Sequence, residues 1–168
     1  MALKRVVVTG MGAVSPFGRG IEALWDGLLE NRSAITNIPD LHQIKGLRCH
    51  VAGLVTGINP KEIPRKFRRT MSKMPVYATL AAQDALNDAG VPLDYCSQGR
   101  LGLVIGSTTG SVHTIQNFFE DFLKDYSLER IKSTLFFQIM GHSCAANVAQ
   151  TLGITGPILA PSAACSTG

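Results

Sequence analysis

Short continuous apolar runs alternate along the chain with longer segments in which apolar side chains recur every three or four residues. The runs Arg5–Thr9, Leu101–Ile105 and Pro157–Ala160 have the pattern of strands that are covered on both faces. A shorter run over 50–55, which Gly53 interrupts, also favours a strand. We therefore predict three buried strands and one short additional strand.

The longer segments have the spacing of helices that bury one face. We predict helices over 20–31, 72–89, 115–122 and 140–152. Ser72 is suited to cap the second of these, and alanines give that helix a small-residue face for close packing. Because strands and helices alternate, we expect an α/β fold with a parallel sheet.

Length and composition fit one globular unit. The chain has 168 residues, of which 45% are hydrophobic and 17% are charged, so it can bury a sizeable core and is too apolar to be disordered. Its apolar stretches are shorter than the roughly 20 residues that a membrane span needs, and its first residues lead directly into a strand pattern. We expect neither a membrane partner nor an export signal.

Cysteine, histidine and net charge exclude several classes of site. The four cysteines, at 49, 96, 144 and 165, form no CxxC pair, which argues against a disulfide framework and suits the cytoplasm. None of the four histidines has the spacing of metal ligands, so we expect no metal site. The net charge of +4 is too modest to require nucleic acid as a partner.

Two glycine-rich loops resemble nucleotide-binding loops only in part. Gly10 and Gly12 follow a predicted strand, as in the dinucleotide-binding fingerprint, but Ser15 occupies the third glycine position. The next helix begins only near Gly20, which is too late to place a pyrophosphate at its N-terminus. The favoured interpretation is that these glycines allow a tight backbone path. A dinucleotide-binding module remains the lesser alternative. The second loop, GSTTGS, lacks the lysine of a P-loop.

A basic segment, IPRKFRRTMSKM at residues 63–74, has no acidic residue from Lys66 to Lys73. The first interpretation is a solvated helix face. The second is a docking surface for an acidic partner, where such charges mainly raise the association rate and set orientation.

Cys165 lies among small residues after the last predicted strand, in the segment APSAACSTG. A cysteine is often only a small buried hydrophobe. Here the small neighbours would let a substrate reach the sulfur, and a helix starting at this point would favour the thiolate and supply amide groups for an oxyanion. A nucleophile on a strand–turn–helix element is the arrangement of the hydrolase elbow. We therefore predict that Cys165 is a nucleophile.

Three stretches, KRVVVTGMGAVSPFG, GLVIGSTTGS and GITGPILAPSAACSTG, resemble in order and spacing the β-ketoacyl-acyl-carrier-protein synthases that elongate fatty acids. The resemblance covers essentially the whole chain and implies a thiolase-type α/β/α/β/α fold. It further implies that residues 1–168 are the N-terminal ketosynthase half of a homodimeric enzyme that needs no cofactor.

The resemblance also implies residue roles. Cys165 corresponds to the acyl-accepting nucleophile, and Lys66 and Arg69 to contacts with the acidic acyl-carrier protein that bears the phosphopantetheine thioester. The family's catalytic histidines and lysine match nothing here, so we expect them in a second half and expect this chain alone to be inactive. An alternative is a non-catalytic partner subunit that sets chain length, although such subunits typically lack the cysteine.

Overall fold

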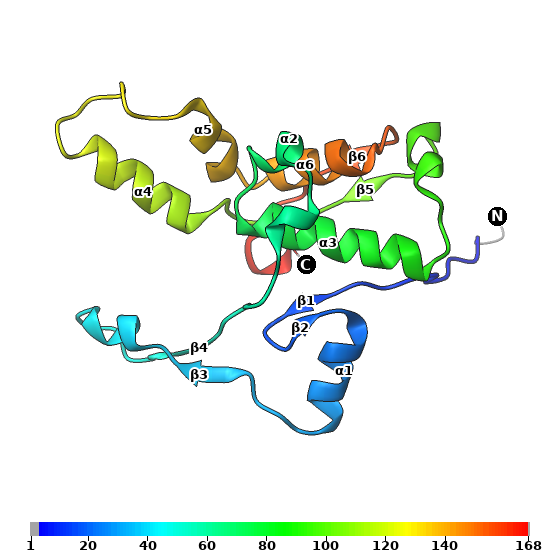
Figure 1. The fold of residues 1–168 in the computed structure, drawn as a ribbon, viewed down its shortest axis with the longest axis horizontal. Coiled ribbons are helices and arrows are strands. Elements are labelled where there is room, and N and C mark those ends of the chain that lie inside the picture. Colours follow the sequence, from blue (N-terminus) through cyan, green and yellow to red (C-terminus); the bar gives the residue numbers. More distant parts are fainter. Residues whose placement is uncertain (1–3, 168) are drawn as a thin grey trace.

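The computed structural model describes residues 4–167 and places one long helix, α3, at the centre of the molecule (Figure 1). The helices are α1 (Ile21–Leu29), α2 (Arg65–Arg68), α3 (Lys73–Asp88), α4 (Val112–Phe122), α5 (Ser133–Ile139) and α6 (Ser143–Leu152). The strands are β1 (Val14–Ser15), β2 (Gly18–Arg19), β3 (Ile35–Asn37), β4 (Val51–Gly53), β5 (Leu103–Val104) and β6 (Ile158–Leu159).

The centre of the fold is the pair α3 and α6. Cys144, Val148 and Leu152 on α6 are buried in one apolar cluster, against which Ala78 and Ala82 of α3 pack. A second cluster on the other side of α3 contains Leu80 and three further buried residues: Ile63, Met71 and Val76. The small-residue helix predicted over 72–89 is thus confirmed, and its alanines allow the close packing that the sequence suggested.

The strands β5 and β6 form a parallel pair, with Leu103 opposite Ile158 and Val104 opposite Leu159. This pairing and the helix α6 packed against it confirm the parallel α/β prediction. The expected burial on both faces is wrong. Val104 and Leu159 are 64% and 59% exposed, because among residues 4–167 the helices cover only the face that Leu103 presents to α6.

The N-terminal run Arg5–Thr9 was predicted to be a buried strand, and this prediction is wrong for the described structure. Val6 and Val8 are 90% and 81% exposed, and the run has no strand partner within residues 4–167. The backbone N–H and C=O groups of a strand need a neighbouring strand for their hydrogen bonds. An apolar run in the sequence does not show whether such a neighbour is present. The segment that follows lies along α3 instead, and the Met11 N–H donates to Asp88 at 2.8 Å.

Gly10 and Gly12 explain this contact with α3. A Cβ at Gly12 would overlap the carbonyl oxygen of Ala81, and one at Gly10 would overlap Ala85 and Ala89. The glycines therefore permit a close approach of two backbones. This agrees with the first of the two interpretations of these glycines, a tight backbone path, and not with a dinucleotide-binding loop. Since helix backbone fills the space beside the loop, a pyrophosphate has no access on that side.

The remaining elements confirm most predicted positions. Helices α1 and α4 occupy the predicted segments, and the strand predicted over 50–55 is β4, antiparallel to β3. Ser72 is the N-cap residue of α3, but its hydroxyl makes no capping hydrogen bond. The helix predicted over 140–152 begins only at Ser143, because Met140 is extended and separates it from α5, which was not predicted.

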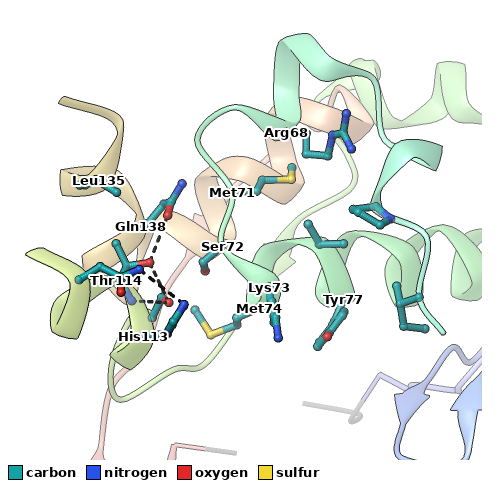
Figure 2. A pocket seen from close by; sticks show the side chains of 15 residues that line it. Arg68, Met71, Ser72, Lys73, Met74, Tyr77, His113, Thr114, Leu135 and Gln138 are labelled. Carbon is teal, nitrogen blue, oxygen red and sulfur yellow. Dashed lines mark hydrogen bonds between the residues drawn. The ribbon is translucent and has the colours of Figure 1, made fainter. Parts of the chain in front are cut away.

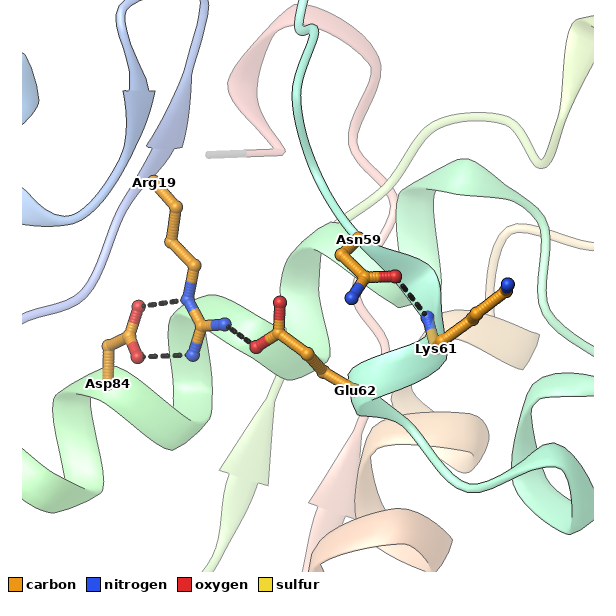
Figure 3. A network of polar contacts seen from close by, with 5 residues as sticks. All are labelled: Arg19, Asn59, Lys61, Glu62 and Asp84. Atoms are coloured by element: carbon orange, nitrogen blue, oxygen red, sulfur yellow. Dashed lines mark hydrogen bonds and ion pairs between the residues drawn. The ribbon is translucent and has the colours of Figure 1, made fainter.

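An ion-pair network ties the β1–β2 hairpin to α3 (Figure 3). Arg19 donates from Nε and Nη2 to the two carboxylate oxygens of Asp84, at 2.7 and 2.5 Å, and from Nη1 to Glu62 at 2.5 Å. The hydrogen bonds to Asp84 raise the pKa of the Arg19 guanidinium above its ordinary value. Arg19 and Asp84 are only 26% and 24% exposed, so solvent screens this pair incompletely.

Replacement of Arg19 by methionine is expected to lower the free energy of unfolding by about 1–2 kcal/mol, because Asp84 loses both bonds from the guanidinium while still partly buried. Urea unfolding of the natural full-length protein measures this loss. The matched control is Arg130→Met, whose pair with Asp125 is about half exposed and should cost less than about 0.5 kcal/mol. Equal effects of the two substitutions would contradict a stabilising role for the Arg19 network.

Candidate active site

Cys165 lies in a short exposed turn that follows the parallel pair. After β6 the chain runs through Pro161 into a single 3-10 turn, Ala164–Ser166, and the Cys165 side chain is exposed. Ala164, immediately before it, has φ of 48°, in the left-handed region that non-glycine residues rarely adopt. Cys165 is therefore exposed among residues 4–167, and its role as a nucleophile stays a prediction. The expected α-helix start is a 3-10 turn as far as Thr167, and Gly168 lies outside the described residues.

The glycine-rich loop GSTTGS, residues 106–111, borders this turn. A Cβ added at Gly106 would lie 2.5 Å from the carbonyl oxygen of Thr167, and the Thr108 hydroxyl lies 3.1 Å from the carbonyl oxygen of Ala164. At its far end, Ser111 caps α4 by accepting a hydrogen bond from the Thr114 N–H at 3.2 Å. The loop therefore joins the cysteine turn to α4.

The other cysteines have different surroundings. Cys144 and Cys96 are buried in the α6 cluster, and burial raises the pKa of the Cys144 thiol to about 11. Burial therefore favours the neutral thiol of Cys144 and leaves none of the residue exposed to solvent. Cys49 is exposed near β4, with its sulfur 3.7 Å from the carbonyl oxygen of Val51. Only Cys49 and Cys165 are thus accessible to a reagent.

The basic segment lies on α2 and at the start of α3. Lys66 and Arg69 are both exposed, and the Lys66 ammonium lies 4.7 Å from the centroid of the Phe67 ring. Arg68 differs, because it is partly buried and lines a groove. The segment therefore divides into exposed charges, Lys66 and Arg69, and a groove-lining charge, Arg68.

The groove, with a volume of about 940 Å³, was not predicted from the sequence. Figure 2 shows α4 and α5 on one side and the segment from Arg68 to Tyr77 on the other. Its basic residues are Arg68, Lys73 and His113, and no acidic residue is among those that line it. Apolar walls edged with positive charge suit a ligand that combines an apolar part with a negative group. Cys165 is not among the lining residues.

The helix α5 is the reason that the groove was missed. It supplies Leu135 and Gln138 to the wall, and the Thr114 hydroxyl of α4 lies 3.1 Å from the Gln138 side-chain oxygen. The apolar pair Phe136 and Phe137 in the sequence was an available signal for this helix. None of the six helices described is long and apolar enough to cross a membrane.

Comparison with known proteins gives a consistent result. The family model described as "Beta-ketoacyl synthase, N-terminal domain" matches residues 3–168. The chain is 34% identical to 3-oxoacyl-[acyl-carrier-protein] synthase 2 of Vibrio cholerae, covering 100% of this chain and 40% of that protein. It is 33% identical to 3-oxoacyl-[acyl-carrier-protein] synthase 1 of Haemophilus influenzae, covering 98% of this chain and 40% of that protein.

Solved structures agree with this result. A β-ketoacyl synthase from Burkholderia phymatum has a TM-score of 0.86 and 35% identity, over 99% of this chain and 41% of the other. The ishigamide ketosynthase/chain length factor has a TM-score of 0.85 and 27% identity, over 99% of this chain and 42% of the other.

The fold is that of the thiolase-type condensing enzymes, as the resemblance implied. The chain belongs to the β-ketoacyl synthase family and corresponds to its N-terminal domain. It spans about 40% of the length of the curated relatives that it matches.

Proposed function

We propose that the protein containing this chain is a 3-oxoacyl-acyl-carrier-protein synthase of fatty acid biosynthesis and that Cys165 accepts the acyl group. The observation that carries the proposal is the exposed Cys165 thiol, placed after the parallel strands β5 and β6 on a turn of small residues. Family membership agrees, since the relatives from Vibrio cholerae and Haemophilus influenzae are named as synthases of this type.

The reaction has two half-reactions. In the first, the Cys165 thiolate attacks the carbonyl carbon of an acyl thioester and the bond from that carbon to the carrier's sulfur breaks. The carrier's phosphopantetheine leaves as a thiolate and takes up a proton from solvent. In the second, malonyl-carrier loses carbon dioxide, and the resulting enolate carbon attacks the Cys165 thioester. The cysteine sulfur leaves, and the carrier holds a 3-oxoacyl chain two carbons longer. Sulfur suits this role because it is both a good nucleophile and a good leaving group.

The enolate oxygen needs hydrogen-bond donors in the transition state. In the family resemblance these come from histidines and a lysine that no motif of this chain matches. We therefore assign residues 1–168 to the N-terminal ketosynthase half and place those donors in a C-terminal half. From the same resemblance, we also propose that the protein is a homodimer in the cytoplasm.

Lys66 and Arg69 are proposed to dock an acidic acyl-carrier protein. Both side chains are exposed, and no acidic residue interrupts the segment between them. One related structure, 19% identical and therefore informative about the fold alone, is a type II polyketide acyl-carrier protein in complex with its ketosynthase.

The double substitution Lys66→Glu with Arg69→Glu is expected to weaken binding of the carrier about tenfold and to leave the unfolding midpoint nearly unchanged, because two exposed charges are reversed. Surface plasmon resonance at two salt concentrations measures the effect. The matched control is Lys45→Glu with Arg48→Glu, an equal charge change at exposed positions outside the basic segment. Equal weakening by both pairs, or unfolding with unchanged affinity, would contradict specific docking here.

A chain-length-setting subunit is the second candidate, and the related ishigamide structure contains a ketosynthase and a chain length factor. Such a subunit has no need of an accessible thiol at this turn. The exposed Cys165 therefore favours the catalytic role.

A further inference from the structure

The backbone immediately before Cys165 is held in an unfavourable conformation. Ala164 has φ of 48°, where its Cβ crowds the following carbonyl group, and alanine gains nothing locally that offsets this cost. Such a conformation persists only when surrounding contacts determine it. Because the peptide joining Ala164 to Cys165 sets the direction of the cysteine side chain, those contacts also set the position of the sulfur.

The contacts are made by two threonine hydroxyls. Thr167 donates to the carbonyl oxygen of Ala164 at 2.7 Å and accepts from the Ala163 N–H at 2.8 Å. Thr108 donates to the same Ala164 carbonyl at 3.1 Å, and its oxygen lies 3.3 Å from that of Thr167. Thr108 is 56 residues away from Ala164 in the sequence, so it links the turn to a separate part of the fold.

The loop that carries Thr108 is itself held firmly. The Ser107 hydroxyl donates to the Thr109 carbonyl at 2.7 Å and lies 3.3 Å from the sulfur of Met74 on α3. At Gly110, a side chain would overlap the carbonyl group of Ile139 at the end of α5. The loop is thus fixed against two helices and offers the Thr108 hydroxyl from a defined position.

We propose that Thr108 is a positioning residue for Cys165: through the Ala164 carbonyl it holds the left-handed turn and so directs the thiol toward the acyl thioester. The inference rests on the proposed nucleophilic role of Cys165. It gives the GSTTGS loop a function that needs no phosphate ligand. Thr108 acts through the turn and contacts no reacting atom.

The test compares Thr108→Val, which removes the hydroxyl at nearly constant shape, with Thr108→Ser, which keeps it. In the natural full-length protein, the rate of acyl mass gain on the peptide containing Cys165 should fall about tenfold in the valine variant and return to near the wild-type rate in the serine variant. Affinity for the carrier should stay unchanged in both. The matched control is Thr36→Val, at an exposed position on β3.

The outcomes are distinguishable. A valine variant that is acylated at the wild-type rate, or a serine variant as slow as the valine variant, overturns the proposal. If the valine variant does not fold, the comparison of Thr108→Ser with Thr108→Ala decides in its place. If the wild-type protein gains no acyl mass, the proposed function fails. Crystal structures of wild type and Thr108→Val then still test whether Thr108 holds the turn, since Ala164 should leave the left-handed region only in the variant.

Discussion

On the proposed function, replacing Cys165 by alanine is expected to lower the formation of 3-oxoacyl-carrier at least about a thousandfold, because the variant lacks the sulfur on which the acyl intermediate is proposed to form. The same variant of the natural full-length protein is expected to gain no acyl mass when it is incubated with an acylated carrier. Product formation is measured by chromatography of the carrier species, and acylation by intact-protein mass spectrometry.

The matched control for this substitution is Cys49→Ala. Cys49 is the other exposed cysteine, so its removal tests whether any accessible thiol can serve. The control should keep both activities. Cys144 requires no control of this kind, because burial raises its pKa to about 11 and the reactive thiolate is absent at lower pH. A Cys165→Ala variant that gains the same acyl mass as wild type would refute the assignment.

Replacing Gly12 by alanine is expected to lower the stability of the protein strongly. The added Cβ would overlap the carbonyl group of Ala81 in the middle of α3, and neither backbone can yield without moving the helix or the segment before β1. Overpacking of this kind costs about 1–3 kcal/mol or more, so we expect a loss of at least about 2 kcal/mol in the free energy of unfolding. Urea unfolding of the full-length protein measures it.

Gly102→Ala is the matched control for the Gly12 substitution. A Cβ there would lie 3.2 Å from the Pro157 carbonyl oxygen and 3.9 Å from the Pro157 Cδ, and a small shift of the exposed backbone relieves the closer contact. We expect a loss below about 1 kcal/mol. A Gly12 variant as stable as the Gly102 variant would show that the loop does not depend on its close approach to α3.

The spacing of apolar residues was sufficient to predict elements whose structure depends on residues close together in the sequence. The helices α1, α3 and α4 were predicted because their apolar residues follow the helical period. The parallel pairing of β5 and β6 followed from alternation of strands and helices. The burial of the strands was overestimated. The sequence of a run such as Arg5–Thr9 shows that most of its side chains are apolar, but it does not show which segment covers them.

The sequence likewise predicted some features of the candidate site and missed others. Cys165 could be singled out because its small neighbours are adjacent in the sequence. Lys66 and Arg69 were chosen through the family resemblance, within a basic segment that has no acidic residue from Lys66 to Lys73. The hydrogen bond from Thr108 to Ala164 joins residues 56 positions apart, so no local pattern contains it. The groove was missed for a similar reason, since its two walls meet only after α5 has packed beside α4.

The most direct test of the central claim is to locate the acyl group on the wild-type full-length protein. The protein is incubated with an acylated carrier, digested, and mapped by tandem mass spectrometry. The account predicts one acyl group, bound as a thioester to Cys165. An acyl group on Cys49 instead, or a fully acylated carrier that leaves every cysteine unmodified, would contradict it.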